Sequence, residues 1–184
     1  MKYKFKDLMD IKSGINVTRI KDEDKKYLYT VVDMLNDLHG VESEIEGNSD
    51  TLKEGDILFQ SLKASASVVS KYTCKKIVSA NFSYCRSKEE GIYDPWYLCY
   101  AINEKKEIRK QIYELSRPST GTISRLSAKL FSELEIDLPD LSLQKDLAKL
   151  YQKTMRLNYL KEKDNYISNK KILLKMEELE DKYV

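Results

Sequence analysis

LEIDLPDLSLQKDLAKL, residues 134–150, is the stretch where the sequence changes character. A short apolar run, Leu134, Ile136 and Leu138, predicts a strand that ends at Pro139. Neither proline nor glycine follows Pro139, and these two residue types are the strongest breakers of regular structure. The rest of the chain therefore predicts one long helix that begins near Ser142, whose hydroxyl can cap it.

This helix is far longer than a small domain needs. Roughly 40 helical residues span about 60 Å at about 1.5 Å per residue. We therefore expect a domain over residues 1–140 and a separate helix over residues 141–184.

The predicted helix carries an apolar stripe that needs a partner. Leu160, Ile167 and Leu174 are spaced seven residues apart, as in a coiled coil, although Asp164 and Lys171 interrupt the companion positions. An isolated helix this polar is only marginally stable, so a second helix is expected to cover the stripe. The alternative is that the helix folds back on its own domain. The side chains expected at the dimer contact are Leu150, Leu157, Leu160, Ile167 and Leu174.

Composition excludes several classes of protein. The 184 residues are 41% hydrophobic and 34% charged, with a net charge of +2, which is typical of a folded soluble chain. No apolar run approaches the roughly 18 residues of a membrane span, and the N-terminus lacks the apolar core of a signal peptide. Three widely spaced cysteines suit a reducing cytoplasm, and the single histidine, His39, completes no zinc motif with them. We expect a cytoplasmic protein with no bound metal and no membrane association.

Charge is distributed in blocks along the chain. Residues 31–60 hold eight acids and one base, whereas residues 61–88 hold six bases and no acid. Residues 117–131 add three bases, again with no acid. Both basic blocks are rich in serine and threonine, and cations with hydroxyl groups are suited to phosphates and base edges. The blocks predict nucleic-acid binding, and the alternative is a solvated strand face.

The first half of the chain has mostly strand character and the second half is helical. Expected strands cover residues 27–32, 41–46, 57–59 and 75–86, with one helical turn within 6–14 and a strand or binding loop at 15–20. Asp94 and Pro95 predict the start of a helix, because aspartate caps well and proline suits the first turn. Further helices are expected over residues 104–115 and 127–132. The fold class is therefore α+β.

Five stretches in order resemble one known family. The stretch LEIDLPDLSLQKDLAKL resembles the end of a target recognition domain in the specificity subunits of type I restriction–modification systems. The matching residues are Ile136, Leu138, Pro139, Leu141 and Gln144. Four further stretches that resemble this family are KEGDILF, IVSANFSYCR, IYDPWYLCYAIN and GTISRLSAKLF. The N-terminal KDLMDIKSGINVTR also resembles the opening of the family. One departure is the segment SLKASASVV, which lacks the glycines common there.

The resemblance implies a half-length subunit with one target recognition domain and one spacer helix. Two copies are expected to pair their helices as an antiparallel coiled coil, so that the homodimer recognises a palindromic, two-part DNA site. The chain itself is expected to be non-catalytic and to bind no cofactor. Expected partners are double-stranded DNA, an adenine-methylating modification subunit with S-adenosylmethionine, and a restriction–motor subunit with ATP and Mg²⁺.

Three regions are expected to contact DNA, with lysines mainly on phosphates and the other side chains available to bases. The first region is Asn16, Thr18, Arg19 and Lys21; the second is Ser61, Lys63, Ser65, Lys71 and Tyr72; the third is Arg117, Ser119, Thr120, Thr122 and Arg125.

Two other classes of function stay open. The chain is alternatively a truncated decoy that binds the modification subunit without directing methylation. A free-standing enzyme is the third class, because DPWY at residues 94–97 resembles the catalytic tetrapeptide of amino-methyltransferases. A helix cap explains the same Asp94 and Pro95. A nuclease motif from Pro139-Asp140 to Glu180-Asp181-Lys182 spans the whole helix and is discounted.

Overall fold

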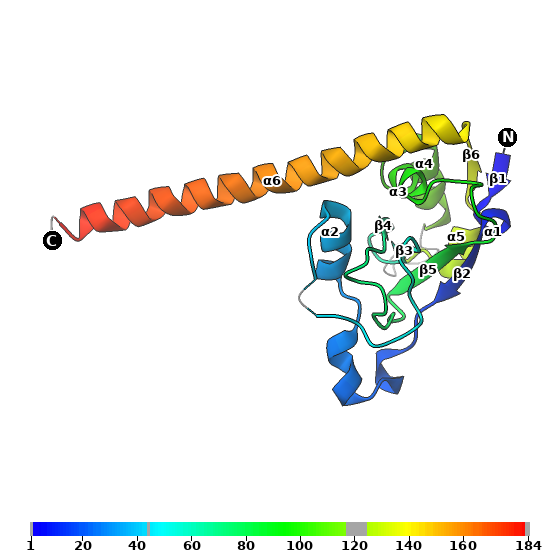
Figure 1. Cartoon of the computed structure of the whole chain (residues 1–184), viewed down its shortest axis with the longest axis horizontal. Coiled ribbons are helices and arrows are strands. Elements are labelled where there is room, and N and C mark those ends of the chain that lie inside the picture. Colours follow the sequence, from blue (N-terminus) through cyan, green and yellow to red (C-terminus); the bar gives the residue numbers. More distant parts are fainter. Residues whose placement is uncertain (1, 44, 117–124, 183–184) are drawn as a thin grey trace.

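One long helix extends from a head that contains the sheets and the other helices (Figure 1). The computed structural model describes residues 2–43, 45–116 and 125–182. The helix, α6, runs from Leu141 to Glu180, and its side chains are exposed from residue 161 to the end of the helix. The predicted long helix is confirmed, although Asp140 rather than Ser142 caps it, accepting from the Leu143 backbone N–H at 3.0 Å.

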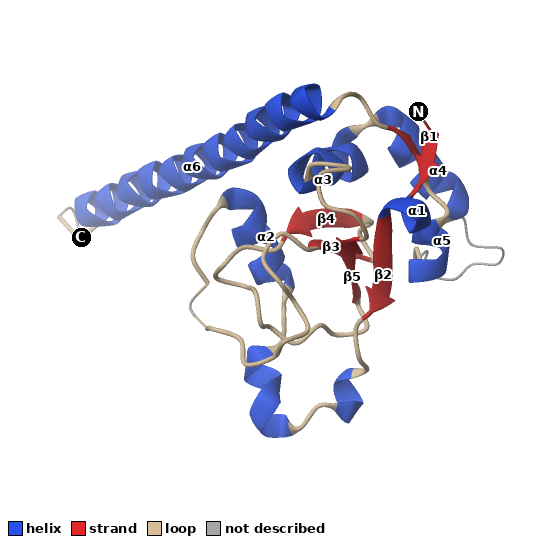
Figure 2. Cartoon of the chain, turned by 45° about the vertical axis from the view of Figure 1, so that its right-hand side comes forward, coloured by secondary structure: helices blue, strands red, loops and turns tan. Residues whose placement is uncertain are grey.

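Two antiparallel sheets form the centre of the head (Figure 2). A four-stranded sheet has the order β2-β5-β3-β4, and a two-stranded sheet joins β1 to β6 at the base of α6. Within the larger sheet Ile11 lies opposite Cys85, and Cys85 lies opposite Ile57. The strand bounds are β1 Lys2–Lys4, β2 Met9–Ser13, β3 Ile57–Gln60, β4 Ser65–Val68, β5 Phe82–Ser87 and β6 Glu135–Asp137.

Helices lie around the larger sheet. Asp94 caps α3 by accepting from the N–H groups of Trp96 and Tyr97, as predicted, and α3 packs on both β4 and α6. The helix bounds are α1 Phe5–Leu8, α2 Val31–His39, α3 Pro95–Glu104, α4 Lys106–Leu115 and α5 Ala128–Ser132, with short 3₁₀ turns η1 Val17–Arg19 and η2 Asp22–Tyr27. No described helix combines the length and apolar character needed to cross a membrane.

The two faces of strand β3 build two cores. Phe59 stacks on Phe131, with ring centroids 4.1 Å apart, in the core that also receives α1, α3 and α4. Leu58 points the other way, into a smaller core that contains Tyr29 and Met34. This alternation is the period-2 pattern of a strand buried on both faces.

Four local predictions are wrong. Residues 27–32 are not a strand, because η2 ends at Tyr27 and Thr30 caps α2, which begins at Val31. The described part of 41–46 contains no strand, whereas 15–20, expected as a strand or a binding loop, is a loop that contains η1. In 75–86 only β5 is a strand, while in 6–14 the helical turn stops at Leu8 and β2 follows.

Candidate nucleic-acid interface

The first predicted DNA-contact region is held against the loop that precedes β5. The N–H of Ile15 donates to the Val78 carbonyl at 2.9 Å, and the N–H of Ala80 donates to the Ile15 carbonyl at 2.8 Å. Asn16 uses its side-chain carbonyl to accept from the Thr18 N–H at 3.1 Å. The side chains of Thr18, Arg19 and Lys21 are exposed, so they are free to meet a ligand.

The turn between β3 and β4 joins this loop to the third region. The N–H of Ser61 donates to the Asn81 carbonyl, and the N–H of Leu126 donates to the Ser61 carbonyl, both at 3.1 Å. Arg125 precedes Leu126, and both Arg125 and Lys63 are exposed. We call the surface of Asn16, Thr18, Arg19, Lys21, Ser61, Lys63 and Arg125 the loop edge.

Part of the second predicted region lies elsewhere. Ser65 is half-buried and its hydroxyl faces the Met34 sulfur at 4.0 Å, so it points toward α2. Lys71 and Tyr72 follow Val68, at the opposite end of the β3–β4 hairpin from Ser61. A four-residue strand is about 13 Å long, so these residues do not share a surface with the loop edge. The predicted grouping of Lys71 and Tyr72 with Lys63 is therefore wrong.

Tyr72 faces the long helix instead. Its hydroxyl donates to Glu42 at 2.7 Å, and the Lys71 Nζ lies 4.8 Å from its ring centroid. Tyr72 also lines a hollow of about 390 Å³ together with Tyr159 and Lys163 of α6. The remaining predicted residues, Arg117, Ser119, Thr120 and Thr122, lie outside the described residues.

Two of the six bases in residues 61–88 are neutralised inside the head. Lys76 Nζ lies 2.5 Å from Asp33, and both side chains are almost fully buried. Arg86 contacts both carboxylate oxygens of Asp56, at 2.9 and 2.6 Å. The number of bases counted along this block therefore overstates the positive charge that is available to a phosphate backbone.

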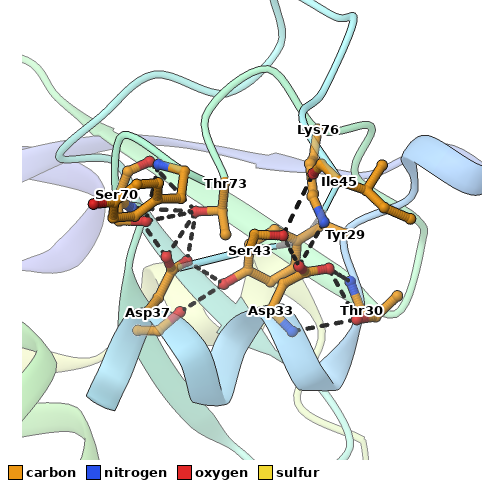
Figure 3. A network of polar contacts seen from close by, with 11 residues as sticks. Tyr29, Thr30, Asp33, Asp37, Ser43, Ile45, Ser70, Thr73 and Lys76 are labelled. Carbon is orange, nitrogen blue, oxygen red and sulfur yellow. Dashed lines mark hydrogen bonds and ion pairs between the residues drawn. The ribbon is translucent and has the colours of Figure 1, made fainter. Parts of the chain in front are cut away.

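A buried polar network that sequence reasoning missed surrounds α2 (Figure 3). Asp37 accepts from the hydroxyls of Tyr29 at 2.6 Å and Thr73 at 2.7 Å, and from the Ser70 N–H at 3.1 Å. Burial raises the pKa of Asp37 despite these donors. The sequence signal was Thr30-x-x-Asp33, a capping pattern that places both aspartates on a helix. This network ties α2 to the loop over residues 70–76.

Residues 134–150 connect the head to α6, which we call the rod. Gln144 is buried, accepts from the Asp94 N–H at 3.0 Å and donates to the Pro139 carbonyl at 2.9 Å. Two turns further along α6, the side-chain amide of Asn103 donates to the Tyr151 hydroxyl at 3.0 Å. Both contacts hold the first part of α6 on α3. From residue 161 onward the side chains of α6 are exposed, so the alternative in which the whole helix folds back on its own domain is wrong.

Asp94, Cys85 and Cys99 have structural surroundings. The carboxylate of Asp94 accepts hydrogen bonds from the N–H groups of Trp96 and Tyr97 at the start of α3, as a helix cap does. Burial raises the pKa of the Cys85 and Cys99 thiols, which disfavours their reactive thiolate forms. No group of three or more metal-ligating side chains gathers in the described ranges.

The apolar stripe of the rod is uncovered. Leu150, Leu157, Leu160, Ile167 and Leu174 are between 41% and 63% exposed. The side chains that face the head, Gln144, Ala148 and Tyr151, lie on another side of the helix.

Solved structures from type I restriction–modification systems are similar to this chain. One, reported under the structural basis of complex assembly and conformational transition of the type I R-M system, has a TM-score of 0.60 and 16% sequence identity. The match covers 94% of this chain. The HsdS subunit of Thermoanaerobacter tengcongensis has a TM-score of 0.58 and 14% sequence identity, and the match covers 95% of this chain. The type I S subunit of M. genitalium has a TM-score of 0.52 and 15% sequence identity, and the match again covers 95% of this chain. Neither a family model nor a curated protein matches the sequence.

The fold is therefore that of the type I restriction–modification specificity subunits, and the predicted resemblance is confirmed at this level. This chain spans 43%, 47% and 44% of the three matched chains, which is less than half of each.

Proposed function

We propose that this chain is the DNA sequence-recognition subunit of a type I restriction–modification complex and works as a homodimer of half-subunits. The observation that carries the proposal is the shared fold over 94% of the chain, combined with a rod whose apolar stripe is left exposed. In this proposal the head selects the DNA sequence and the rod sets two heads apart.

The loop edge is the proposed DNA surface. Arg19, Lys21, Lys63 and Arg125 provide cations there, and Asn16, Thr18 and Ser61 provide groups that hydrogen-bond to base edges or phosphates. Phosphate contacts release counterions, so binding to duplex DNA is expected to weaken steeply as salt rises.

A modification subunit is the proposed protein partner, and it would carry S-adenosylmethionine. Beyond the stripe, the outer half of the rod exposes Ile172, Met176 and Leu179, at 59%, 54% and 48%. At 3.6 residues per turn these three lie on a different side of the helix from Ile167 and Leu174. One paired helix cannot cover both sides, so a second partner is expected there. ATP and Mg²⁺ belong to the proposed restriction–motor subunit.

Selection of bound duplexes from a random pool tests the proposal. The dimer is expected to return a two-part site with two-fold symmetry. Absence of duplex binding would contradict DNA recognition, and a compact asymmetric site would contradict the dimer.

Co-expression with an adenine-methylating type I modification subunit tests the partner. Methylation at the selected site is expected. Stable co-purification without methylation would instead favour the decoy.

A further inference from the structure

The rod carries both apolar and charged residues at its heptad positions. Position a is held by Leu143, Leu150, Leu157, Asp164 and Lys171; position d is held by Asp146, Lys153, Leu160, Ile167 and Leu174. All ten side chains are exposed. Charged residues at such positions set the register of a coiled coil, because a buried charge must meet an opposite one.

This seam is accessible to a second helix. The head contacts α6 through Gln144, Ala148 and Tyr151, and again where His39 meets Arg156 and Tyr159. Leu143 and Leu150 each precede one of the buried residues, which turns them about 100° around a helix of 3.6 residues per turn. A second helix that packs on Leu143 and Leu150 therefore does not have to displace the head.

One antiparallel alignment satisfies every layer. With the two-fold axis between Asn158 and Tyr159, each a residue faces a d residue of the second copy. The apolar layers pair Leu157 with the partner's Leu160, Leu150 with the partner's Ile167, and Leu143 with the partner's Leu174. The charged layers pair Asp164 with the partner's Lys153, and Lys171 with the partner's Asp146.

Other alignments leave charges unmatched. A parallel pair places Asp146, Lys153, Asp164 and Lys171 each against its own copy, so four layers repel. Sliding the antiparallel pair by one heptad puts Asp164 against the partner's Leu160. Sliding it the other way puts Lys153 against the partner's Leu157. In each case a charge loses water without gaining a partner.

We propose that two copies of this chain pair through α6 in this single register, an inference that rests on the proposed homodimer and specifies it. Leu141, the first residue of the helix, then lies level with the partner's Met176, which is 35 residues along the helix. At about 1.5 Å per residue the two heads begin about 52 Å apart along the rod.

Disulfide cross-linking reads the register directly. Cys85 and Cys99 are fully buried, so a Cys74→Ser background leaves no exposed native thiol among the cysteines. In this background the double variant Leu150→Cys/Ile167→Cys is expected to run at the mass of a covalent dimer after mild oxidation. Leu150→Cys/Leu160→Cys and Leu157→Cys/Ile167→Cys report the two slid registers and are expected to stay uncrosslinked. Leu150→Cys alone cross-links only in a parallel pair.

A charge exchange gives an independent measurement. Lys153→Glu places two acids in each of two layers and is expected to raise the dimer Kd about tenfold or more. Adding Asp164→Lys restores opposite charges and is expected to recover most of that loss. Glu162→Lys, on the exposed side away from the seam, is the matched control and should leave the Kd within about threefold.

The outcomes separate this inference from the proposed function. A dimer that cross-links in another register, or in none of the pairs, or that the charge exchange fails to restore, overturns the register alone. A monomer of the unsubstituted chain in light scattering overturns the dimer and the register together.

Discussion

Arg156 of the rod donates from Nη1 to the backbone carbonyl of His39, 3.1 Å away, at the end of α2. The His39 ring also stacks on Tyr159, with centroids 5.0 Å apart. A cation at the C-terminus of a helix satisfies free carbonyls and opposes the helix dipole. The head is therefore attached to the rod at two places, through α3 near Gln144 and through α2 at Arg156.

Arg156→Gln should loosen the second attachment while leaving the first in place. A cation at a helix C-terminus contributes about 0.3–1 kcal/mol, so opening of α2 should rise roughly two- to fivefold. Hydrogen exchange across Val31–His39 measures this opening. Lys149→Gln, an exposed change on the same helix, is the control. Equal exchange in the two variants would show that Arg156 does not hold α2.

The buried pair of Asp33 and Lys76 should dominate the stability of α2. Lys76→Met leaves the Asp33 carboxylate without its cation and is expected to lower the free energy of unfolding by about 3–5 kcal/mol. Asp33→Asn/Lys76→Met removes both charges and should lose less than the single variant. Lys53→Met at the surface is the control, and urea unfolding is the measurement. A loss under 1 kcal/mol in Lys76→Met would contradict this role.

Acid should weaken the fold through Asp33. Burial alone would raise the pKa of Asp33, but hydrogen bonds from Lys76 and Thr30 hold it below its ordinary value. A lowered folded pKa gives stability that is present above the unfolded pKa of about 3.9 and is lost as pH falls below it. Urea midpoints from pH 7 to pH 3 should therefore fall less in Asp33→Asn than in the unsubstituted chain.

Asp37 should act with the opposite sign. Burial raises its pKa, so the folded state favours the protonated carboxyl and gains stability as pH falls through that raised value. Asp37→Asn removes this gain, and its midpoint should decline more steeply with acid than that of the unsubstituted chain. A parallel decline would contradict the assignment.

Local signals predicted the helices well and the strands poorly. Asp94-Pro95 and the proline at 139 act within one turn of the chain, so they specify helix starts without tertiary information. Residues 27–32 have strand-like composition, yet the capping pair Thr30 and Asp33 begins a helix there. Strand propensity depends on what the side chains pack against, and here α2 packs on β4 and α6.

The charge blocks group residues that the fold separates. Neighbours in sequence need not be neighbours in space, and the β3–β4 hairpin separates Lys63 from Lys71 by its full length. Burial of Lys76 beside Asp33 joins the acidic block to the basic one, a pairing 43 residues apart in sequence. Such long-range neutralisation depends on the tertiary fold and leaves no periodic signal.

This separation of the two ends of the hairpin predicts which cations meet DNA. Arg19→Gln, Lys63→Gln and Arg125→Gln at the loop edge should each weaken duplex binding, and each should flatten the slope of log K against log salt by about 0.9 where the side chain contacts one phosphate. Lys71→Gln is the matched control, because Lys71 lies over the ring of Tyr72, which lines a hollow together with residues of the rod. Fluorescence anisotropy with a labelled duplex over a salt series measures both quantities. If Lys71→Gln flattens the slope as much as the others, the duplex must lie across the opposite end of the hairpin, and the loop edge is not the DNA surface.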